Sequence, residues 1–368
     1  MSIAWETLKS PPRILMEAQL QPVQGTRFQP TGFPDLGAAR YTLNSGNGAA
    51  ESVEMVLVES AQSMANHLEA VCWNEADDDL VDCLKGMPYV RVNLWNGQST
   101  NSILEAHRLN SPYIMNDEGF KETLRDKAGV PRRGRGQSAN EGAEEEDLGG
   151  AGLLSRQKLA AATFYYDPGT TLHGVFLEKL DGRTRLQRLI SAFVEAKDVS
   201  DAHSGGVKND RVAPRPRALH EAGISVGARE GYGNVPFHRV EYVAEAITAY
   251  FSLDLAQLRA YGLGEPAERF LITLALWKVR RFLDTGLRLR TACDLDMVGD
   301  LEVTRPKHGF MLPTTSELED DIPALIEACA NQGLFANPPI TELTFQTMAP
   351  LRSRRSSGGS AASSNEDE

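Results

Sequence analysis

Patterns of apolar and polar residues divide the chain into predicted strands and helices. Ile14, Met16, Ala18 and Leu20 alternate with polar residues, which predicts a half-buried strand over residues 13–23. Such alternation places every second side chain on the same face of a sheet, so this segment is the first strand that we expect.

A second pattern, with apolar residues at a helical period, predicts long amphipathic helices over residues 52–73 and 266–283. The remaining predicted elements are a strand at 89–94, a helix at 153–165, a strand at 173–180 that ends in the Asp181-Gly182 turn, a strand at 240–253 and an interrupted closing strand at 287–303. Residues 100–115 fit either a helix or a strand.

Four stretches are predicted to be loops or tails. Residues 24–41, QGTRFQPTGFPDLGAARY, are rich in Gly and Pro and form a shaped loop. Residues 130–152 contain six glycines and are a flexible insertion, and residues 198–238 form a second loop-rich region. The low-complexity residues 346–368 are a disordered tail, which leaves residues 1–345 as one domain with insertions.

The order of strand, long helix, further strands, helix and strand indicates an α+β fold. It is the order of a ferredoxin-like βαββαβ unit enlarged by insertions. The RNA-recognition motif uses the same fold, although its aromatic RNP signature is absent from this chain.

Composition is that of a globular protein, with 41% hydrophobic and 24% charged residues. The sequence has neither an apolar run of roughly 20 residues nor a secretory signal, so we expect a cytoplasmic protein without a membrane partner. The four cysteines are widely spaced and are predicted to be reduced, buried thiols. Nucleotide-binding glycine motifs and zinc-ligand spacings are absent, so no cofactor and no metal are expected.

The net charge of −12 is unusual for a protein that binds nucleic acid. However, 17 of the 50 acidic residues lie in four windows without Lys or Arg, at 75–82, 141–147, 317–321 and 366–368. The rest of the chain holds 33 acids and 38 bases, so a local basic surface is compatible with the composition.

Several basic residues beside glycines are candidates for phosphate binding. Arg27 and Arg40 lie in the loop at 24–41, and Lys208 and Arg211 lie in SGGVKNDRV. In GYGNVPFHRVEY, Tyr232 and Phe237 could stack on bases while His238 and Arg239 contact phosphate or ribose. A further basic segment, KVRRFLDTGLRLRTACDL, contains Arg288 and Arg290. Each segment alone also fits a turn or a solvated surface.

Catalytic motifs are absent: the sequence contains no GxSxG elbow and no kinase motif set, so no catalytic residue is expected. Asp294 and Asp296 alternate along a predicted strand and could bind a divalent ion, but such a pair is more often simply exposed to solvent.

Six blocks in order, QGTRFQPTGFPDLGAARY, LVESAQSMANHLE, YDPGTTLHGVFLEKL, SGGVKNDRV, GYGNVPFHRVEY and GLRLRTACDL, resemble the backbone subunit of type I CRISPR effector complexes. The form they resemble is subtype G, formerly subtype U, of the RAMP superfamily. The resemblance implies a modified RNA-recognition fold with an inserted thumb at 198–238, and a subunit that does not cleave RNA. Its implied partners are guide RNA, target DNA that pairs with the guide, copies of itself and other subunits of the complex.

The same resemblance points to Arg27, to Lys208, Asn209 and Arg211 in the thumb, and to His238 and Arg239 as contacts of the guide. Two other functions remain open. One is a metal-independent guide-processing endoribonuclease that uses His238 or His203 together with Lys208. The other is a protein-binding adaptor without RNA contact.

Overall fold

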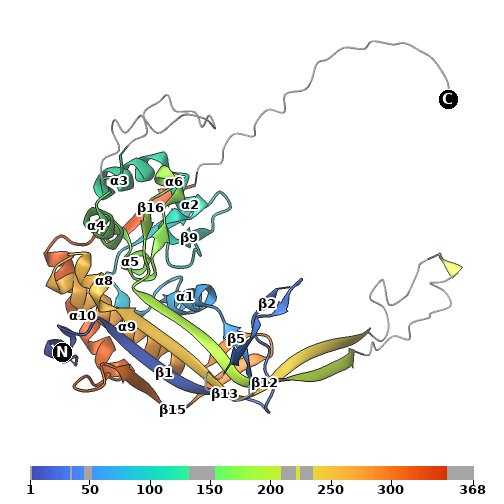
Figure 1. The fold of residues 1–368 in the computed structure, drawn as a ribbon. Coiled ribbons are helices and arrows are strands. Elements are labelled where there is room, and N and C mark those ends of the chain that lie inside the picture. Colours follow the sequence, from blue (N-terminus) through green and yellow to red (C-terminus); the bar gives the residue numbers. More distant parts are fainter. Residues whose placement is uncertain are drawn as a thin grey trace, which may run out of the picture.

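A seven-stranded antiparallel sheet forms the centre of the molecule (Figure 1). The computed structural model describes residues 2–33, 35–44, 52–131, 154–208, 221–223 and 235–345. The strand order is β14 (Leu287–Arg290), β15 (Cys293–Arg305), β1 (Arg13–Pro22), β13 (Val235–Asp254), β12 (Ile190–Lys208), β5 (Ser52–Glu59) and β4 (Arg40–Asn44). The chain therefore has an α+β fold.

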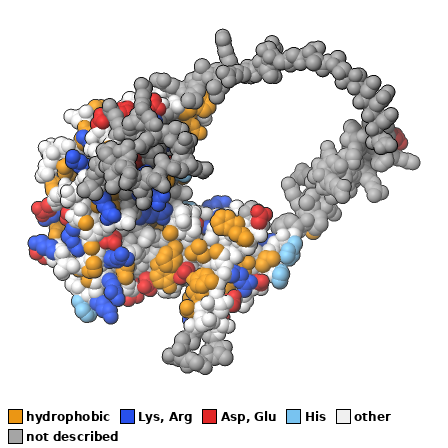
Figure 2. Space-filling model, turned by 45° about the horizontal axis from the view of Figure 1, so that its top comes forward, with side chains coloured by type: hydrophobic (Ala, Val, Ile, Leu, Met, Phe, Trp, Pro, Cys, Tyr) orange, Lys and Arg blue, Asp and Glu red, His pale blue; other side chains and the backbone are white. Residues whose placement is uncertain are grey.

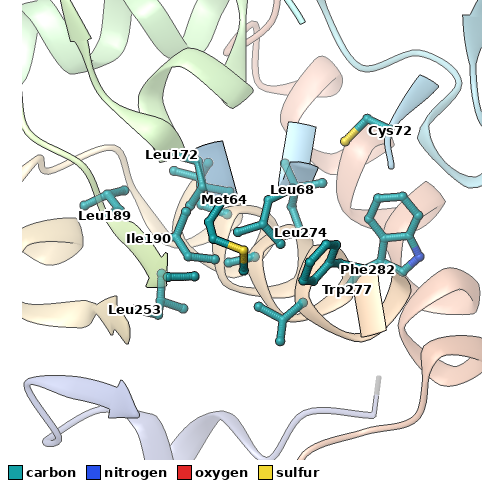
Figure 3. Packing of buried hydrophobic residues seen from close by; sticks show 14 of the residues in the cluster. Met64, Leu68, Cys72, Leu172, Leu189, Ile190, Leu253, Leu274, Trp277 and Phe282 are labelled. Carbon is teal, nitrogen blue, oxygen red and sulfur yellow. The ribbon is translucent and has the colours of Figure 1, made fainter. Parts of the chain in front are cut away.

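Helices α1 (Ala61–Ala70) and α9 (Glu265–Asp284) pack on one face of this sheet, and α10 (Thr315–Asn331) packs against α9. The predicted alternation in β1 is confirmed, because Ile14, Met16 and Ala18 are buried beneath the helices. Figure 3 shows Met64 and Leu68 of α1 packed among side chains of α9 and of the central strands. Burial of this apolar surface is the main source of stability.

A second group of elements lies above the sheet in Figure 1. It contains the three-stranded sheet β16 (Ile340–Thr344), β8 (Tyr89–Asn93) and β9 (Ser99–Asn101), and the two-stranded sheet β10 (Val175–Phe176) and β11 (Arg185–Leu186). Its helices are α2 (Pro112–Met115), α3 (Glu118–Ala128), α4 (Arg156–Tyr166), α5 (Pro168–His173) and α6 (Glu178–Asp181), with the 3₁₀ helix η3 (Arg108–Asn110). We call this group the upper module.

Strands β12 and β13 continue far beyond the sheet as a two-stranded ribbon (Figure 1). Their pairing runs without a register shift from Ile190 opposite Leu253 to Lys208 opposite Val235. Within the described residues of these strands, the outermost buried apolar side chains are Val199 in β12 and Tyr242 in β13. Beyond Glu241, which is 8% exposed, the described side chains of the ribbon are exposed or half-buried.

Several predicted elements are wrong in detail. Residues 52–73 form mainly strand β5 followed by α1. Ser60 begins the helix, because its side-chain oxygen accepts a hydrogen bond from the amide of Ser63 and so caps the first turn. Residues 173–180 contain the end of α5, the short strand β10 and part of α6 instead of one strand. Residues 287–303 are two paired strands, β14 and β15, instead of one interrupted strand.

The loop predictions have mixed outcomes. Residues 24–41 are mostly loop, with the short hairpin β2 (Gly32–Phe33) and β3 (Gly37–Ala38) and the first residues of β4. The two ends of the predicted loop region 198–238 are the strands of the ribbon. Residues 132–153, most of the predicted insertion, lie outside the described residues, as do 209–220, 224–234 and 346–368. The ambiguous residues 100–115 hold the end of β9, η3 and α2.

All four cysteines are free thiols; Cys72, Cys293 and Cys329 are buried and Cys83 is half-buried. Across the described part of the chain, no helix is both long and apolar enough to pass through a bilayer.

Candidate nucleic-acid interface

Two of the predicted arginines meet on one carboxylate at the base of the ribbon. Arg27 Nη1 lies 3.1 Å from Glu241 Oε2, and Arg239 Nη1 lies 3.6 Å from Glu241 Oε1. The backbone produces this meeting, because Phe28 and Tyr242 exchange two N–H···O bonds of 2.9 Å that fix the loop at 24–41 against β13. Two guanidinium groups on one carboxylate leave a local surplus of positive charge.

A groove of about 500 Å³ opens beside these arginines, and we call it the ribbon-base groove. Its lining comes from four parts of the chain: Val23, Gln24, Arg27, Glu241, Thr285, Gly286, Leu287, Arg288, Ala292, Asp294 and Leu295. Arg288 is 80% exposed and lies 3.7 Å from Asp294. Such an exposed ion pair is weak, so the guanidinium can exchange its partner for a phosphate.

Arg40 lies beside the ribbon, in β4, and is held by acidic side chains. Its Nη1 donates to Asp201 at 2.7 Å, its Nη2 lies 3.5 Å from Glu54, and its guanidinium carbon lies 5.8 Å from the centre of the Tyr242 ring. The side chain is 36% exposed. A phosphate contact by Arg40 would therefore compete with two carboxylates.

Arg290 is more deeply placed than the other predicted arginines, and its donors bond to protein atoms. It donates to the carbonyl of Gln29 at 3.1 Å, to that of Val58 at 2.9 Å and to the carboxylate of Glu59. These bonds fasten the loop at 24–41 to β5 and β14. Arg290 thus positions the groove, and its contact with RNA stays a prediction.

The ribbon carries the two predicted histidines. The rings of His203 and His238 stack with their centres 5.6 Å apart, and both side chains are exposed. Lys208 pairs through its backbone with Val235 near the outer end of the ribbon. Asn209, Arg211 and Tyr232 lie outside the described residues, and Phe237 is described only by its backbone pairing with Gly206.

The sequence prediction missed Glu241, the acidic residue that organises the site. Ser204 Oγ donates to Glu241 Oε2 at 2.8 Å, so one carboxylate joins both strands of the ribbon to the loop. The signal was present, because Arg239 and Glu241 alternate in a strand and so share a face. Asp294 pairs with Arg288, and the described residues contain no cluster of three or more metal-ligating side chains.

Charges of both signs alternate over the surface. In Figure 2, Lys and Arg side chains are interspersed with Asp and Glu side chains over the body of the molecule. The basic surface at the base of the ribbon is therefore local, which agrees with a net charge of −12 for the chain.

Comparison with known proteins gives one family. The family described as CRISPR-associated protein GSU0053 matches residues 14–201, slightly more than half of the chain. No curated protein matches the sequence.

Two solved structures are similar at low identity. A chain of a CRISPR RNA-guided surveillance complex in a pre-nicking state has 12% identity and a TM-score of 0.38, with 86% of this chain and 89% of that chain covered. Csc2 of Thermofilum pendens has 12% identity and a TM-score of 0.28, with 91% of this chain and 84% of that chain covered.

Proposed function

Because the chain belongs to the family of CRISPR-associated protein GSU0053, we propose that it is a structural, RNA-binding subunit of a type I-G CRISPR effector complex. The observation that carries the proposal is the convergence of Arg27, Arg239 and Arg288 around the ribbon-base groove. These guanidinium groups hold the phosphates of a guide RNA, because each can form two parallel hydrogen bonds to one phosphate.

The fold that we propose is the modified ferredoxin-like fold of the RAMP superfamily, with the ribbon as its thumb. Four strands of the sheet have the order β15-β1-β13-β12, and each adjacent pair is antiparallel. Numbered along the chain, these strands follow the order 4-1-3-2. Helix α1 precedes β12 and α9 follows β13, which supports a βαββαβ unit.

A subunit with this role needs no base-specific contact. Sequence reading is left to pairing between the guide and the target DNA, while the protein holds the RNA backbone. Several copies of the chain bind along one guide, together with other subunits, so each copy contributes only modest affinity. The net charge of −12 is compatible with this arrangement because Arg27, Arg239 and Arg288 lie together at the groove.

The same proposal assigns no cleavage to this chain. One observation favours a second candidate, guide processing, because His203 and His238 lie together and exposed on the ribbon. Incubation of the purified chain with repeat RNA separates the two. RNA that stays intact supports the structural role, whereas cleavage that is lost in His238→Ala or His203→Ala supports the nuclease.

The decisive experiment replaces two exposed arginines of the groove and leaves the buried carboxylate of Glu241 paired with Arg239. In Arg27→Gln/Arg288→Gln, Arg239 still neutralises Glu241, so we expect folding to be unaffected. Binding of guide RNA is expected to weaken roughly tenfold or more, since hydrogen bonds to charged groups contribute about 1.5–3 kcal/mol each. The salt slope should fall by about 1.4 because each lost phosphate contact removes about 0.7.

The matched control is Arg13→Gln/Arg305→Gln. These two exposed arginines line a groove of about 490 Å³ at the other end of β1, and Arg13 also has one carboxylate partner, Asp254. We expect nearly unchanged affinity in this control. Equal losses in both double variants, or an unchanged salt slope in the first, would contradict a specific groove. A purified chain that carries no nucleic acid and binds none would favour the adaptor.

A further inference from the structure

The upper module contains a separate pocket of about 330 Å³. It lies between the segment that leads through η3 into α2 and the segment of β10 and α6, and we call it the module pocket. Its lining is Ala106, His107, Arg108, Asn110, Pro112, Val175, Phe176, Glu178 and Lys179. None of these residues lines the ribbon-base groove.

Buried polar contacts make the wall of this pocket rigid. Arg108, 7% exposed, donates from Nε and Nη2 to the two carboxylate oxygens of Glu69 at 2.6 and 2.7 Å, and from Nη1 to the carbonyl of Gly174 at 3.3 Å. Asn110 Oδ1 accepts a hydrogen bond of 3.2 Å from the amide of Lys179. The pocket is thus preformed, which lowers the entropy cost of binding a ligand.

Glycine at position 174 is required by the close approach of two chain segments in this wall. Its φ is +76°, and a Cβ atom there would lie 2.7 Å from the carbonyl oxygen of Leu186. Any larger residue would push β10 away from β11. The position of Phe176 next to the pocket therefore depends on a tightly fixed backbone.

The rim of the pocket combines free positive charge with an exposed aromatic ring. Phe176 is 38% exposed, and the guanidinium carbon of Arg185 lies 4.3 Å from the centre of its ring. His107, Lys179 and Arg185 are exposed and form no ion pair within the described part of the chain. One carboxylate, that of Glu178, is the only acidic group in the described lining.

We propose that the module pocket binds one nucleotide of a single-stranded nucleic acid. The base stacks on the platform of Phe176 and Arg185, because any base has a flat face that an aromatic ring and a guanidinium plane can cover. Lys179 and His107 contact the adjacent phosphate. The inference rests on the proposed function for the class of partner, but it adds a contact site that shares no residue with the ribbon-base groove.

This combination of groups selects against simpler ligands. A free phosphate or an acidic peptide would use the cations and would leave an exposed phenylalanine without a role. An apolar ligand would use Phe176 and would leave the cations Lys179 and Arg185 without a partner of opposite charge. Nucleotides need both features at once, a flat apolar face next to a negative charge.

The test uses the full chain and short single strands of RNA and of DNA with the same sequence, each containing one 2-aminopurine. Phe176→Leu is expected to weaken binding roughly tenfold, since one stacked base contributes about 1–3 kcal/mol. It should also remove the quenching of 2-aminopurine fluorescence that stacking causes. Lys179→Gln should weaken binding severalfold and lower the salt slope by about 0.7.

Arg183→Gln is the matched control. Arg183 is exposed in the segment that follows α6, carries the same charge as Lys179 and does not line the pocket. We expect less than about a twofold change for this variant. A loss as large as that of Lys179→Gln would overturn the proposal, because it would show a diffuse basic surface instead of a nucleotide site. Unchanged quenching and affinity in Phe176→Leu would overturn it as well.

Comparison of the two strands identifies the source of the nucleotide. If the Phe176 and Lys179 variants lose affinity for the RNA strand alone, the pocket binds the guide. If they lose affinity for the DNA strand, the pocket binds a DNA strand of the target. Failure of the pocket is also distinguishable from failure of the proposed function. If Arg27→Gln/Arg288→Gln loses binding while the Phe176 and Lys179 variants do not, the groove stands and the pocket does not. If the unaltered chain binds neither strand, both proposals fail.

Discussion

Lys278 shows at the scale of one residue how burial changes the meaning of a charge. The sequence places it in a basic segment, whereas the structure buries it to 1% exposure with Nζ 3.0 Å from Nε2 of His173. His173 is equally buried, and it accepts the hydrogen bond only in its neutral form. The pair therefore serves the interior of the protein rather than a nucleic acid.

Stability should depend on pH through His173. Burial and the neighbouring cations Lys278, Arg108 and Arg188 hold the pKa of His173 well below its ordinary value of 6.5. The unfolded chain gains a proton there as pH falls through 6.5 and the folded protein does not, so stability is complete above that pH and is lost below it. The free energy of unfolding in urea should fall by roughly 1 kcal/mol between pH 7.5 and pH 5.5 from this residue.

The control for this prediction is His173→Gln, which keeps an acceptor for Lys278 and removes the titration. The pKa of His67 is also lowered, mainly by burial, but His67 is present in both proteins, so its contribution cancels in the comparison. An identical pH dependence of the two proteins would contradict this, because it would show that the pKa of His173 is the same in the folded and unfolded states.

The Glu69–Arg108 pair connects the upper module to α1, and its loss should destabilise the whole fold. Glu69 is 3% and Arg108 is 7% exposed, and two hydrogen bonds join them. Arg108→Met leaves a buried carboxylate without its partner, which costs about 3–5 kcal/mol. Urea unfolding should show a smaller loss for Glu69→Met/Arg108→Met. A double variant less stable than Arg108→Met would contradict this.

At the scale of elements, the apolar pattern of a segment correctly predicted those strands and helices whose structure depends mainly on residues within that segment. Strand β1, strand β8 and helix α9 were predicted because one segment of each carries the whole apolar pattern. Residues 52–59 were assigned to a helix because Val53, Val56 and Leu57 have helical spacing, and the continuous apolar run 55–58 of a buried strand cannot be told from a helix by periodicity alone. The capping Ser60 was the signal that divides strand from helix.

Long-range contacts explain what the sequence could not predict. Polar residues and the Gly205-Gly206 pair made the outer ribbon resemble a loop, although the pairing of β12 with β13 continues in one register as far as Lys208 and Val235. Arg27, Arg239 and Arg288 were each named as candidates, but their proximity depends on the bridge between Phe28 and Tyr242. Alternation within one segment cannot reveal such a bridge.

The exposed ribbon should be removable without loss of the fold. We expect replacement of residues 205–238 by Asn-Gly, a favoured two-residue hairpin turn, to change the melting temperature by no more than about 2 °C. Ser204, Arg239 and Glu241 stay in place, and the described residues removed contribute no buried apolar side chain. Binding of guide RNA should weaken. A large drop in melting temperature would show that the ribbon supports the core, and unchanged RNA binding would place the thumb away from the guide.

At the scale of the molecule, the charge distribution separates two effects of salt. In the proposed role, the basic groups of the ribbon-base groove attract RNA, and this attraction should weaken steadily as salt rises. Each copy nevertheless carries a net charge of −12, so copies that bound side by side on one guide, as we propose, would repel each other. Salt screens this repulsion beyond about 10 Å at 0.1 M.

The two effects predict an optimum in assembly along a guide. Native mass spectrometry or light scattering should show the largest number of copies per RNA at intermediate salt, with fewer copies at both lower and higher salt. Replacing the five acidic residues of 141–147 by Gln or Asn reduces the negative net charge from −12 to −7. The salt concentration at which most copies bind should therefore be lower. A steady decline from the lowest salt in both proteins would mean that repulsion between copies is negligible. In that case charges on adjacent copies would lie farther apart than the screening length, because only such a distance removes the repulsion while the charge remains.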